Sequence, residues 1–449
     1  MSHLTERALG LHAIDPNLVS AADRTHLAAC DDCRRALAEL RLFEDALRDP
    51  ETWIGLSPAA PSPRTAELRA FAVRLAAEDE EAVVLLEDFR EPSAAARFMW
   101  DDVASRPEYQ TGGVARLLCQ WAHTMCERDP LYALKLAEAA TSIAMTLPDA
   151  SYPRNTIHDL RGEALKEQAN ALRFLGRLPE ALRAAELAEA EYRRLPHENL
   201  GLASIHYVLG CIHYEQDGLD AAEQAAHEAA DAALRLGADE QYLNAQYLLG
   251  HVLFDRHDYA AAAGIFETIL RQGQSSGTTA WIARGSLAAG GCYVELGKLV
   301  QADRYLHEAL RLFISLDAGL DVTRTQWAIG RLLFAQGNAP EAIHRLRRCL
   351  TELTAYHAIT DAGLVAIDLA EILNAAGRMR QVPQVLANVV TTFMNAGKLT
   401  SALTALAYLK EAANQGTMTP HLLAYVRRFV ERADREPDRL FAPPLSEPL

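Results

Sequence analysis

A forty-residue internal repeat is the feature of this sequence that most restricts its fold. Small residues recur with that period over the middle of the chain, at two positions twelve residues apart. Two antiparallel helices approach to about 8–10 Å where the facing side chains are small, so each Gly and Ala pair predicts a helical hairpin. The residues are Gly210, Gly250, Gly290 and Gly330, followed by Ala222, Ala262, Ala302 and Ala342.

A third register marks the turn inside each hairpin. Gly297, Gly337 and Gly377 each stand seven residues after the first small position. Glycine suits the left-handed residue that ends a helix, and a polar residue and a good helix former then begin the second helix. Apolar residues recur at i, i+3, i+4 and i+7 on both sides of the turn, as amphipathic helices require.

These residues resemble the tetratricopeptide repeat. Its signature of Leu-Gly, an aromatic, Gly, Ala and an aromatic or Leu is matched in two hairpins, whereas its period is about 34 residues. The six extra residues predict longer helices or a longer linker. HEAT repeats also run to about 40 residues, but the Gly-to-Ala spacing favours the tetratricopeptide reading. The matching residues are Leu249, Gly250, Ala262 and Phe266 in one hairpin, and Gly290, Tyr293, Gly297, Ala302 and Ala309 in the next.

The predicted fold class is all-α, with a tetratricopeptide-like superhelix over residues 112–435. A hairpin pattern before Gly210 keeps the register within one residue, and a final pair without the small residues would cap the stack. The rest of the chain divides into a small zinc-binding helical domain (1–50), a Pro-rich linker (51–63), an acidic helical connector (64–111) and a disordered tail (436–449).

The resemblance implies that the first helices line a concave groove. Groove positions lie three residues before, one after and four after the first Gly, and aromatic residues dominate them. Aromatics with Arg favour binding of an extended peptide or an amphipathic helix of a partner protein. The alternative is that these side chains only pack between repeats. The predicted groove residues are Tyr207, Cys211, Tyr214, Tyr247, His251, Phe254, Leu287, Val294, Trp327, Arg331 and Phe334, with Arg284 beside them.

The first fifty residues contain a second pattern. His26, Cys30 and Cys33 stand at i, i+4 and i+7, one face of a helix, and offer an imidazole and two thiolates to a zinc ion. His3 is the expected fourth ligand, and His12 is the alternative. A segment this short buries little apolar surface without a metal or a neighbouring domain. The same spacing recurs at Cys119, His123 and Cys126, which apolar neighbours identify as ordinary core.

The segment resembles the zinc-binding anti-sigma domain, whose pattern is His, about two dozen residues, then His-x-x-x-Cys-x-x-Cys. The resemblance maps the ligands to His3, His26, Cys30 and Cys33, and implies one Zn²⁺ per chain and binding of an extracytoplasmic-function sigma factor. Oxidation of the cysteines with loss of zinc would give a redox switch. Redox-sensing relatives usually carry Cys at the position of His3, so a structural zinc is favoured.

Charge and hydropathy exclude other classes. The formal net charge of −16 and pI of about 5.4 repel a phosphate backbone, so no direct nucleic-acid ligand is expected. No stretch resembles a membrane span, and the first residues carry charges where a signal peptide is apolar, which predicts a cytoplasmic protein without membrane contact. Seven cysteines are too scattered for a disulfide framework and indicate free thiols or metal ligands.

No catalytic constellation is expected. Gly273–Gly277 matches Gly-x-Ser-x-Gly but falls between two helices instead of after a strand. The segment 290–298 departs from a phosphate-binding loop. The leading prediction is therefore a regulatory adaptor that sequesters a sigma factor through its zinc domain and binds a second protein or peptide in its groove. The alternative is a tetratricopeptide scaffold or inhibitor subunit of a protease or signalling complex, with a purely structural zinc.

Overall fold

The computed structural model describes residues 21–38, 63–87, 106–126, 128–356, 358–395, 401–433 and 440–444. It divides the chain into two compact units, residues 1–75 and 76–449, which are treated separately. All regular secondary structure in the described ranges is helical, which confirms the all-α class. The expected ligands His3 and His12 and the linker over 51–62 lie outside these ranges.

The first unit contains α2 (Ala21–Ala29), a further helical segment over residues 31–38, and the beginning of α4 (Pro63–Leu85). The acidic run at 76–83 is helical, as expected, and belongs to the part of α4 that lies in the second unit.

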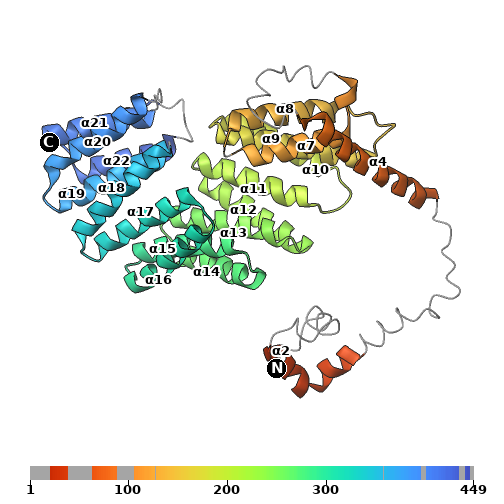
Figure 1. The fold of residues 1–449 in the computed structure, drawn as a ribbon, viewed down its shortest axis with the longest axis horizontal. Coiled ribbons are helices and arrows are strands. Elements are labelled where there is room, and N and C mark those ends of the chain that lie inside the picture. The colour runs from red at the N-terminus through yellow and green to blue at the C-terminus, as the bar shows by residue number, and fades with distance from the viewer. Residues whose placement is uncertain are drawn as a thin grey trace. The chain divides into compact units, whose positions relative to one another are not determined.

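The second unit is a stack of helical hairpins, each made of two consecutive helices (Figure 1). A short 3₁₀ helix precedes the stack, and another opens the second helix of the seventh hairpin. The elements are η4 (Pro107–Tyr109), α7 (Gly112–Met125), α8 (Pro130–Thr146), α9 (Arg154–Phe174), α10 (Leu178–Tyr192), α11 (Leu200–Glu215), α12 (Leu219–Leu236), α13 (Asp239–Asp255), α14 (Tyr259–Ser276), α15 (Thr279–Glu295), α16 (Leu299–Ser315), α17 (Gly319–Ala335), α18 (Ala339–Ala355), α19 (Ile359–Ala375), η5 (Met379–Gln381), α20 (Val382–Asn395), α21 (Ser401–Gln415) and α22 (Pro420–Ala433).

The forty-residue period comes from long helices and short turns. α15, α16, α17 and α18 each have 17 residues, and three-residue turns join them. Of the two explanations for the six extra residues, longer helices are therefore correct. The GQSS of Gly273–Gly277 lies in the last turns of α14 and not in a linker, because the helix runs to Ser276 before Gly277 reverses the chain.

Left-handed residues end the helices at the same period. Gly297, Gly337 and Gly377 have φ of 68°, 83° and 69°, as their register predicts. Asp217 and His257 hold the equivalent turns with φ of 63° and 62°, although a side chain disfavours this conformation. The backbone hydrogen bonds of the turn compensate: Asp258 N–H donates to Leu253 O at 2.9 Å, as Lys298 N–H does to Tyr293 O.

The first Gly of each hairpin is a contact point. A Cβ added at Gly250 would lie 2.5 Å from the Phe266 ring, and one at Gly290 would lie 2.6 Å from Leu306 Cδ2. Both neighbours belong to the second helix of the same hairpin, so the small residue is needed for close packing. Gly210 differs, because its nearest neighbour is Leu248 of the following hairpin, at 2.7 Å.

The first helices lie on the inner side of the stack. α9, α11 and α13 contact one another in sequence, as do α15, α17 and α19, whereas most neighbouring second helices make fewer contacts. In a curved array the elements on the concave side lie closer together. Within each of these two series the first helices therefore lie on the concave side, as the tetratricopeptide resemblance implies. The rings of Tyr247 on α13 and Trp281 on α15 contact each other where the two series meet.

The last hairpin is covered by the chain itself. Phe441 packs against Tyr408, Tyr425 and Phe429, and Tyr425 donates a hydrogen bond to Ala442 O at 2.8 Å. Residues 440–444 of the segment expected to be a disordered tail are thus packed, because an aromatic side chain finds an apolar surface on α21 and α22. Residues 436–439 and 445–449 lie outside the described ranges.

Candidate functional site

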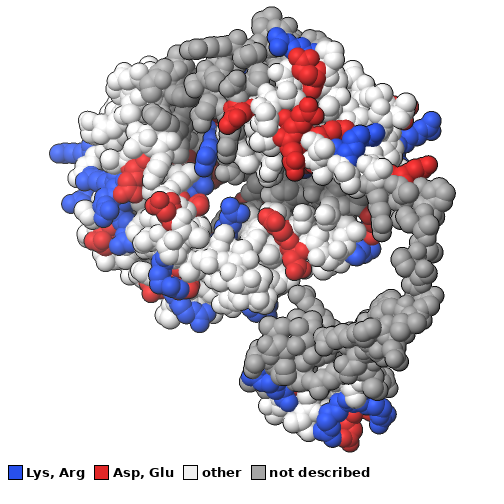
Figure 2. Space-filling view, turned by 45° about the vertical axis from the view of Figure 1, so that its right-hand side comes forward, with Lys and Arg blue, Asp and Glu red and all other residues white. Residues whose placement is uncertain are grey.

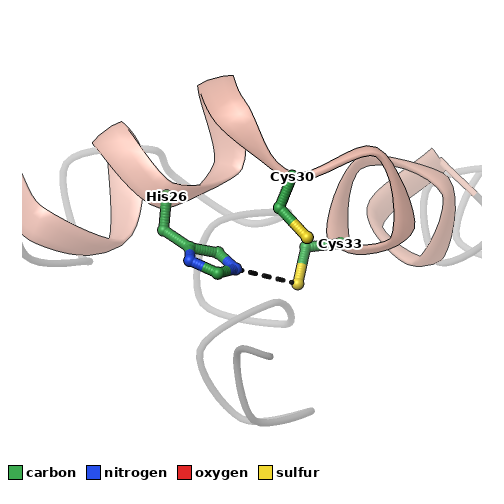
Figure 3. A group of neighbouring side chains, drawn as sticks. All are labelled: His26, Cys30 and Cys33. Atoms are coloured by element: carbon green, nitrogen blue, oxygen red, sulfur yellow. Dashed lines mark hydrogen bonds between the residues drawn. The ribbon is translucent and has the colours of Figure 1, made fainter. Parts of the chain in front are cut away.

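Three predicted metal ligands meet on the first unit. The Nε2 of His26 lies 3.4 Å from Cys33 Sγ, and one ligand atom from each of His26, Cys30 and Cys33 lies within 4.8 Å of the other two (Figure 3). Ligand atoms on a tetrahedral zinc ion are about 3.5–4 Å apart, given Zn–S of about 2.3 Å and Zn–N of about 2.0 Å. The trio therefore fits three corners of such a site. Among the described residues it is the one His, Cys, Asp and Glu group of this kind.

The helix that carries the trio is interrupted at Cys30, where a continuous helix was expected. Cys30 N–H still donates to His26 O at 2.8 Å, and Arg34 N–H donates to Cys30 O at 3.1 Å, so backbone hydrogen bonds join Cys30 to both segments. The Arg34 guanidinium donates to the carbonyls of Leu27 and Ala28, which the break leaves short of helical partners. The side chains of His26, Cys30 and Cys33 stay close together across the break.

Burial of the trio is graded. Cys33 is 2% exposed and clusters with Leu27 and Leu37, while His26 and Cys30 are half-buried. Asp31 and Asp32 between the cysteines are exposed and pair with Arg34 and Arg35. The thiols thus face inward and the charges outward, which suits a site that holds an ion on one side and solvent or a partner on the other.

The two thiols of the second His and Cys set are core, as expected, whereas the prediction is wrong for His123, whose side chain is 68% exposed. Cys119 and Cys126 are 1% and 2% exposed, and Asn170 donates to Cys126 Sγ at 3.6 Å. Burial raises the pKa of the Cys119 thiol, which keeps it neutral. The His123 ring is 3.3 Å from Glu167 Oε2 and does not join a metal group with the thiols. Identical spacing therefore gives different chemistry in different surroundings.

Aromatic side chains form a connected cluster where α13 meets α15. The Tyr247 ring lies edge-on to His251, Phe266 and Trp281, with centroids 4.5, 5.7 and 6.0 Å apart. Phe254 packs on Tyr259 at 5.1 Å. Burial raises the pKa of Tyr247. Phe266 and Trp281 are buried between repeats, whereas Tyr247, His251 and Phe254 remain half-buried, so both sequence interpretations describe part of the cluster.

A polar group stands on α11. Tyr207 and Cys211 lie beside the ion pair between Arg173 and Glu215, and burial raises the pKa of Cys211. The neighbouring Cys211, and then burial, raise the pKa of Tyr207. Tyr214 donates a hydrogen bond to Asp255 on the next inner helix, with an O–O distance of 2.7 Å. The predicted groove residues of α11 are thus held by charged residues that the sequence pattern did not single out.

Asp368 orients the predicted groove residue Trp327 on α17. Its side chain accepts a hydrogen bond from Trp327 Nε1 at 2.5 Å and from Arg427 Nη2 at 2.6 Å, although it is only 4% exposed. Arg331 pairs with Glu295 at 2.7 Å. Asp368 and Arg427 were not predicted, but an acid in the apolar run from Leu364 to Leu373 was a signal for a buried polar role.

Two further groove residues, Phe334 and Arg284, are more exposed. Phe334 is 38% exposed, and the Arg284 guanidinium lies 5.5 Å from the Trp281 ring centroid.

On the face shown in Figure 2, Lys and Arg are interspersed with Asp and Glu and form no broad basic area. No helix in the described part of the chain combines the length and apolar character that a bilayer span requires.

Comparison with known proteins places the fold. No family model matches the sequence, and no curated protein matches it. The structure is similar to aspartyl phosphate phosphatase F from Bacillus subtilis, with 12% identity, 87% of this chain and 95% of that chain covered, and a TM-score of 0.53. The structure is also similar to that of NprR in complex with its cognate peptide NprX, with 13% identity, 80% of this chain and 98% of that chain covered, and a TM-score of 0.49. A tetratricopeptide repeat protein from Parabacteroides merdae is similar as well, with 13% identity, 71% of this chain and 98% of that chain covered, and a TM-score of 0.41. The chain has a tetratricopeptide-like helical repeat fold.

Proposed function

We propose that this protein is a regulatory adaptor that binds a peptide or helix of a partner protein on the concave face of its repeats. The observation that carries the proposal is the row of half-buried aromatic side chains on α11, α13 and α17. Contacts between successive inner helices hold this row, as Tyr214 with Asp255 and Trp327 with Asp368 illustrate.

Such an arrangement suits recognition. Aromatic and Arg side chains supply most of the binding energy in protein interfaces, and rings that are already fixed lose little conformational entropy when a ligand arrives. The carboxylates of Asp255 and Asp368 fix the orientation of a phenol and an indole while the ring faces remain half-buried. The row therefore presents apolar surface in a defined geometry instead of a loose patch.

We further propose one zinc ion on the first unit, held by His26, Cys30 and Cys33 with His3 as the fourth ligand. The chemistry of the donor set and the three mutual distances support it. A bound zinc ion would contribute folding free energy to a helical segment whose buried apolar cluster is small.

The sigma-factor partner is the finer part of the proposal. Its support is the pattern His3, His26, Cys30 and Cys33, together with exposed Asp31, Asp32, Arg34 and Arg35 next to the ligands. A partner that binds this surface would lose it if the metal were removed, because the metal would link His26, before the break at Cys30, to Cys33 after it.

Metal analysis of the full-length protein tests the zinc site. We expect about one zinc per chain, strongly reduced by Cys30→Ser and unchanged by Cys126→Ala, which removes a thiol of the second set. Capture of an extracytoplasmic-function sigma factor should fall with Cys30→Ser only. Zinc-free wild-type protein, with equal capture by both variants, contradicts the proposal. Loss of zinc without loss of the partner supports the scaffold alternative with a structural zinc.

A second experiment tests the groove. Trp327→Ala with Phe334→Ala should weaken partner capture without lowering zinc content. The matched control is Leu187→Ala with Ile314→Ala, which removes two side chains, 58% and 61% exposed, from the second helices α10 and α16. Equal capture by both double variants would remove the groove from the proposed function.

A further inference from the structure

The aromatic row is interrupted at α15. At the position three residues before the repeat Gly, α13 carries Tyr247 and α17 carries Trp327, but α15 carries Leu287. One residue after the repeat Gly, His251 and Arg331 flank Gly291 in the same way. The middle inner helix therefore has shorter side chains than both of its neighbours.

The space beside Gly291 is open. A Cβ built on Gly291 meets no atom within 4 Å, whereas one on the adjacent Gly290 would lie 2.6 Å from Leu306 Cδ2. Leu287 and Val294 on the same helix are half-buried and pack on the core cluster below. Gly291 thus leaves an open space (the depression) beside apolar Leu287 and Val294, on a helix whose inner neighbours carry longer side chains. No backbone strain requires a glycine there, since Gly291 is not among the residues with positive φ.

The positively charged side chain of Arg284 lies toward one end of this depression. Arg284 is exposed and lies seven residues before Gly291 on α15, which is about 10 Å along the helix. The neighbouring Arg324 pairs with both Asp321 and Asp361, at 3.6 and 2.9 Å. Among the described residues no carboxylate lies within ion-pair distance of Arg284, whose guanidinium instead lies over Trp281.

We propose that the depression at Gly291 is a specificity pocket for a bulky apolar side chain of an extended peptide, and that Arg284 binds an Asp or Glu side chain of the same peptide. The inference rests on the proposed groove function and specifies its ligand. The peptide segment that contacts both groups runs along α15. An extended chain rises about 3.3 Å per residue, so the acidic residue of the peptide stands about three positions from the apolar one. The two groups together give an apolar contact and charge complementarity, and charge complementarity contributes to selectivity.

The test uses the full-length protein and a phage-displayed library of random peptides. Selected peptides should carry a Leu, Phe, Tyr or Trp about three positions from an Asp or Glu. A fluorescent copy of a selected peptide should bind Gly291→Trp more than about tenfold more weakly, since the indole fills the depression. Arg284→Glu should weaken binding to a similar extent, more so at low salt.

Two controls match these variants. A Cβ on Gly264 of α14 also meets nothing within 4 Å, so Gly264→Trp adds the same side chain on the second helix of a hairpin. Arg271→Glu reverses an exposed charge on that helix. Both should bind the peptide as the wild type does, and circular dichroism should show equal helix content in all variants.

The outcomes separate this inference from the proposed function. Peptides without the acidic and apolar pair, or affinities unchanged by Gly291→Trp and Arg284→Glu, overturn the pocket. If those same peptides still lose binding to Trp327→Ala with Phe334→Ala, the groove function stands without it. A library that yields no binding peptide overturns the pocket as well, and partner capture then decides the groove by itself.

Discussion

The indole N–H of Trp327 on α17 donates to the carboxylate of Asp368 on α19, 41 residues further along the chain. The same carboxylate binds Arg427 of α22, so one buried acid connects three helices of the C-terminal hairpins. This connection makes a groove residue dependent on a residue with almost no exposed surface.

Replacing Asp368 should therefore destabilise the repeats. Asp368→Ala leaves Trp327 and Arg427 without their shared acceptor, and we expect a loss of about 2–4 kcal/mol in the free energy of unfolding. Urea unfolding followed by circular dichroism measures it. Asp303→Ala, which removes an exposed acid paired with His307, should change stability by less than about 0.5 kcal/mol. A loss for Asp368→Ala no larger than that of the control would contradict this account.

The repeat glycines allow a paired test of packing. Gly290→Ala places a methyl 2.6 Å from Leu306 Cδ2 and should lower stability by about 1–3 kcal/mol. Gly264→Ala meets open space on α14 and should raise stability by about 0.5–1 kcal/mol, because alanine favours the helix. Thermal unfolding of both variants measures the direction of each stability change. Changes in the same direction would show that Gly290 is not in tight contact with Leu306.

The left-handed turns predict opposite effects of glycine. Asp317 has φ of 54° at the turn after α16, and Asp317→Gly should stabilise the protein, by up to about 1 kcal/mol. Gly297→Ala, at φ of 68°, should destabilise it by about 1–2 kcal/mol. Chemical denaturation distinguishes the two. A neutral Gly297→Ala would mean that the turn opens at little cost.

His123 should make stability depend on pH. Its hydrogen bond to Glu167 raises the pKa of the imidazole in the folded state above the unfolded value of about 6.5. The stabilisation is therefore complete below that value and is lost as pH rises through the raised folded pKa. The melting temperature of wild type minus that of His123→Gln should be larger at pH 6 than at pH 9. A difference independent of pH would exclude this contribution.

Cysteine reactivity should report the metal site. Burial raises the pKa of Cys119, Cys292 and Cys349, so their thiols stay neutral and slow to react. After treatment with a chelator, iodoacetamide should modify half-buried Cys30 first, and added zinc should protect it. Mass spectrometry of the alkylated peptides gives the order. Faster modification of Cys292 than of Cys30 would argue against an accessible thiol at the proposed site.

The repeated hairpins were predictable from the sequence because the same small residues recur at the same positions in successive repeats. The recurring glycine and alanine positions located the hairpins, and the structure confirms the left-handed turn at Gly297 and the close helix contact at Gly290. Asp217 and His257 show the limit of that reasoning, since backbone hydrogen bonds hold the same turn without glycine. A search for glycine alone misses them.

The candidate sites were predictable to different degrees. Sequence spacing brought His26, Cys30 and Cys33 together because ligands on one helical face are local. Asp368 and Arg427 were missed because their pairing joins helices 59 residues apart, which no local pattern records. The packed position of Phe441 was missed for the same reason, since a proline-rich context outweighed one aromatic residue in the composition argument.

The position of Phe441 has a consequence for assembly. The outer side of α21 and α22 is where another hairpin, or the first hairpin of a neighbouring molecule, would stack by the same geometry that joins the repeats. The Phe441 ring already occupies apolar surface of α21 and α22. A neighbouring molecule that stacked on this surface would have to displace that ring, so the contacts of Phe441 disfavour end-to-end association.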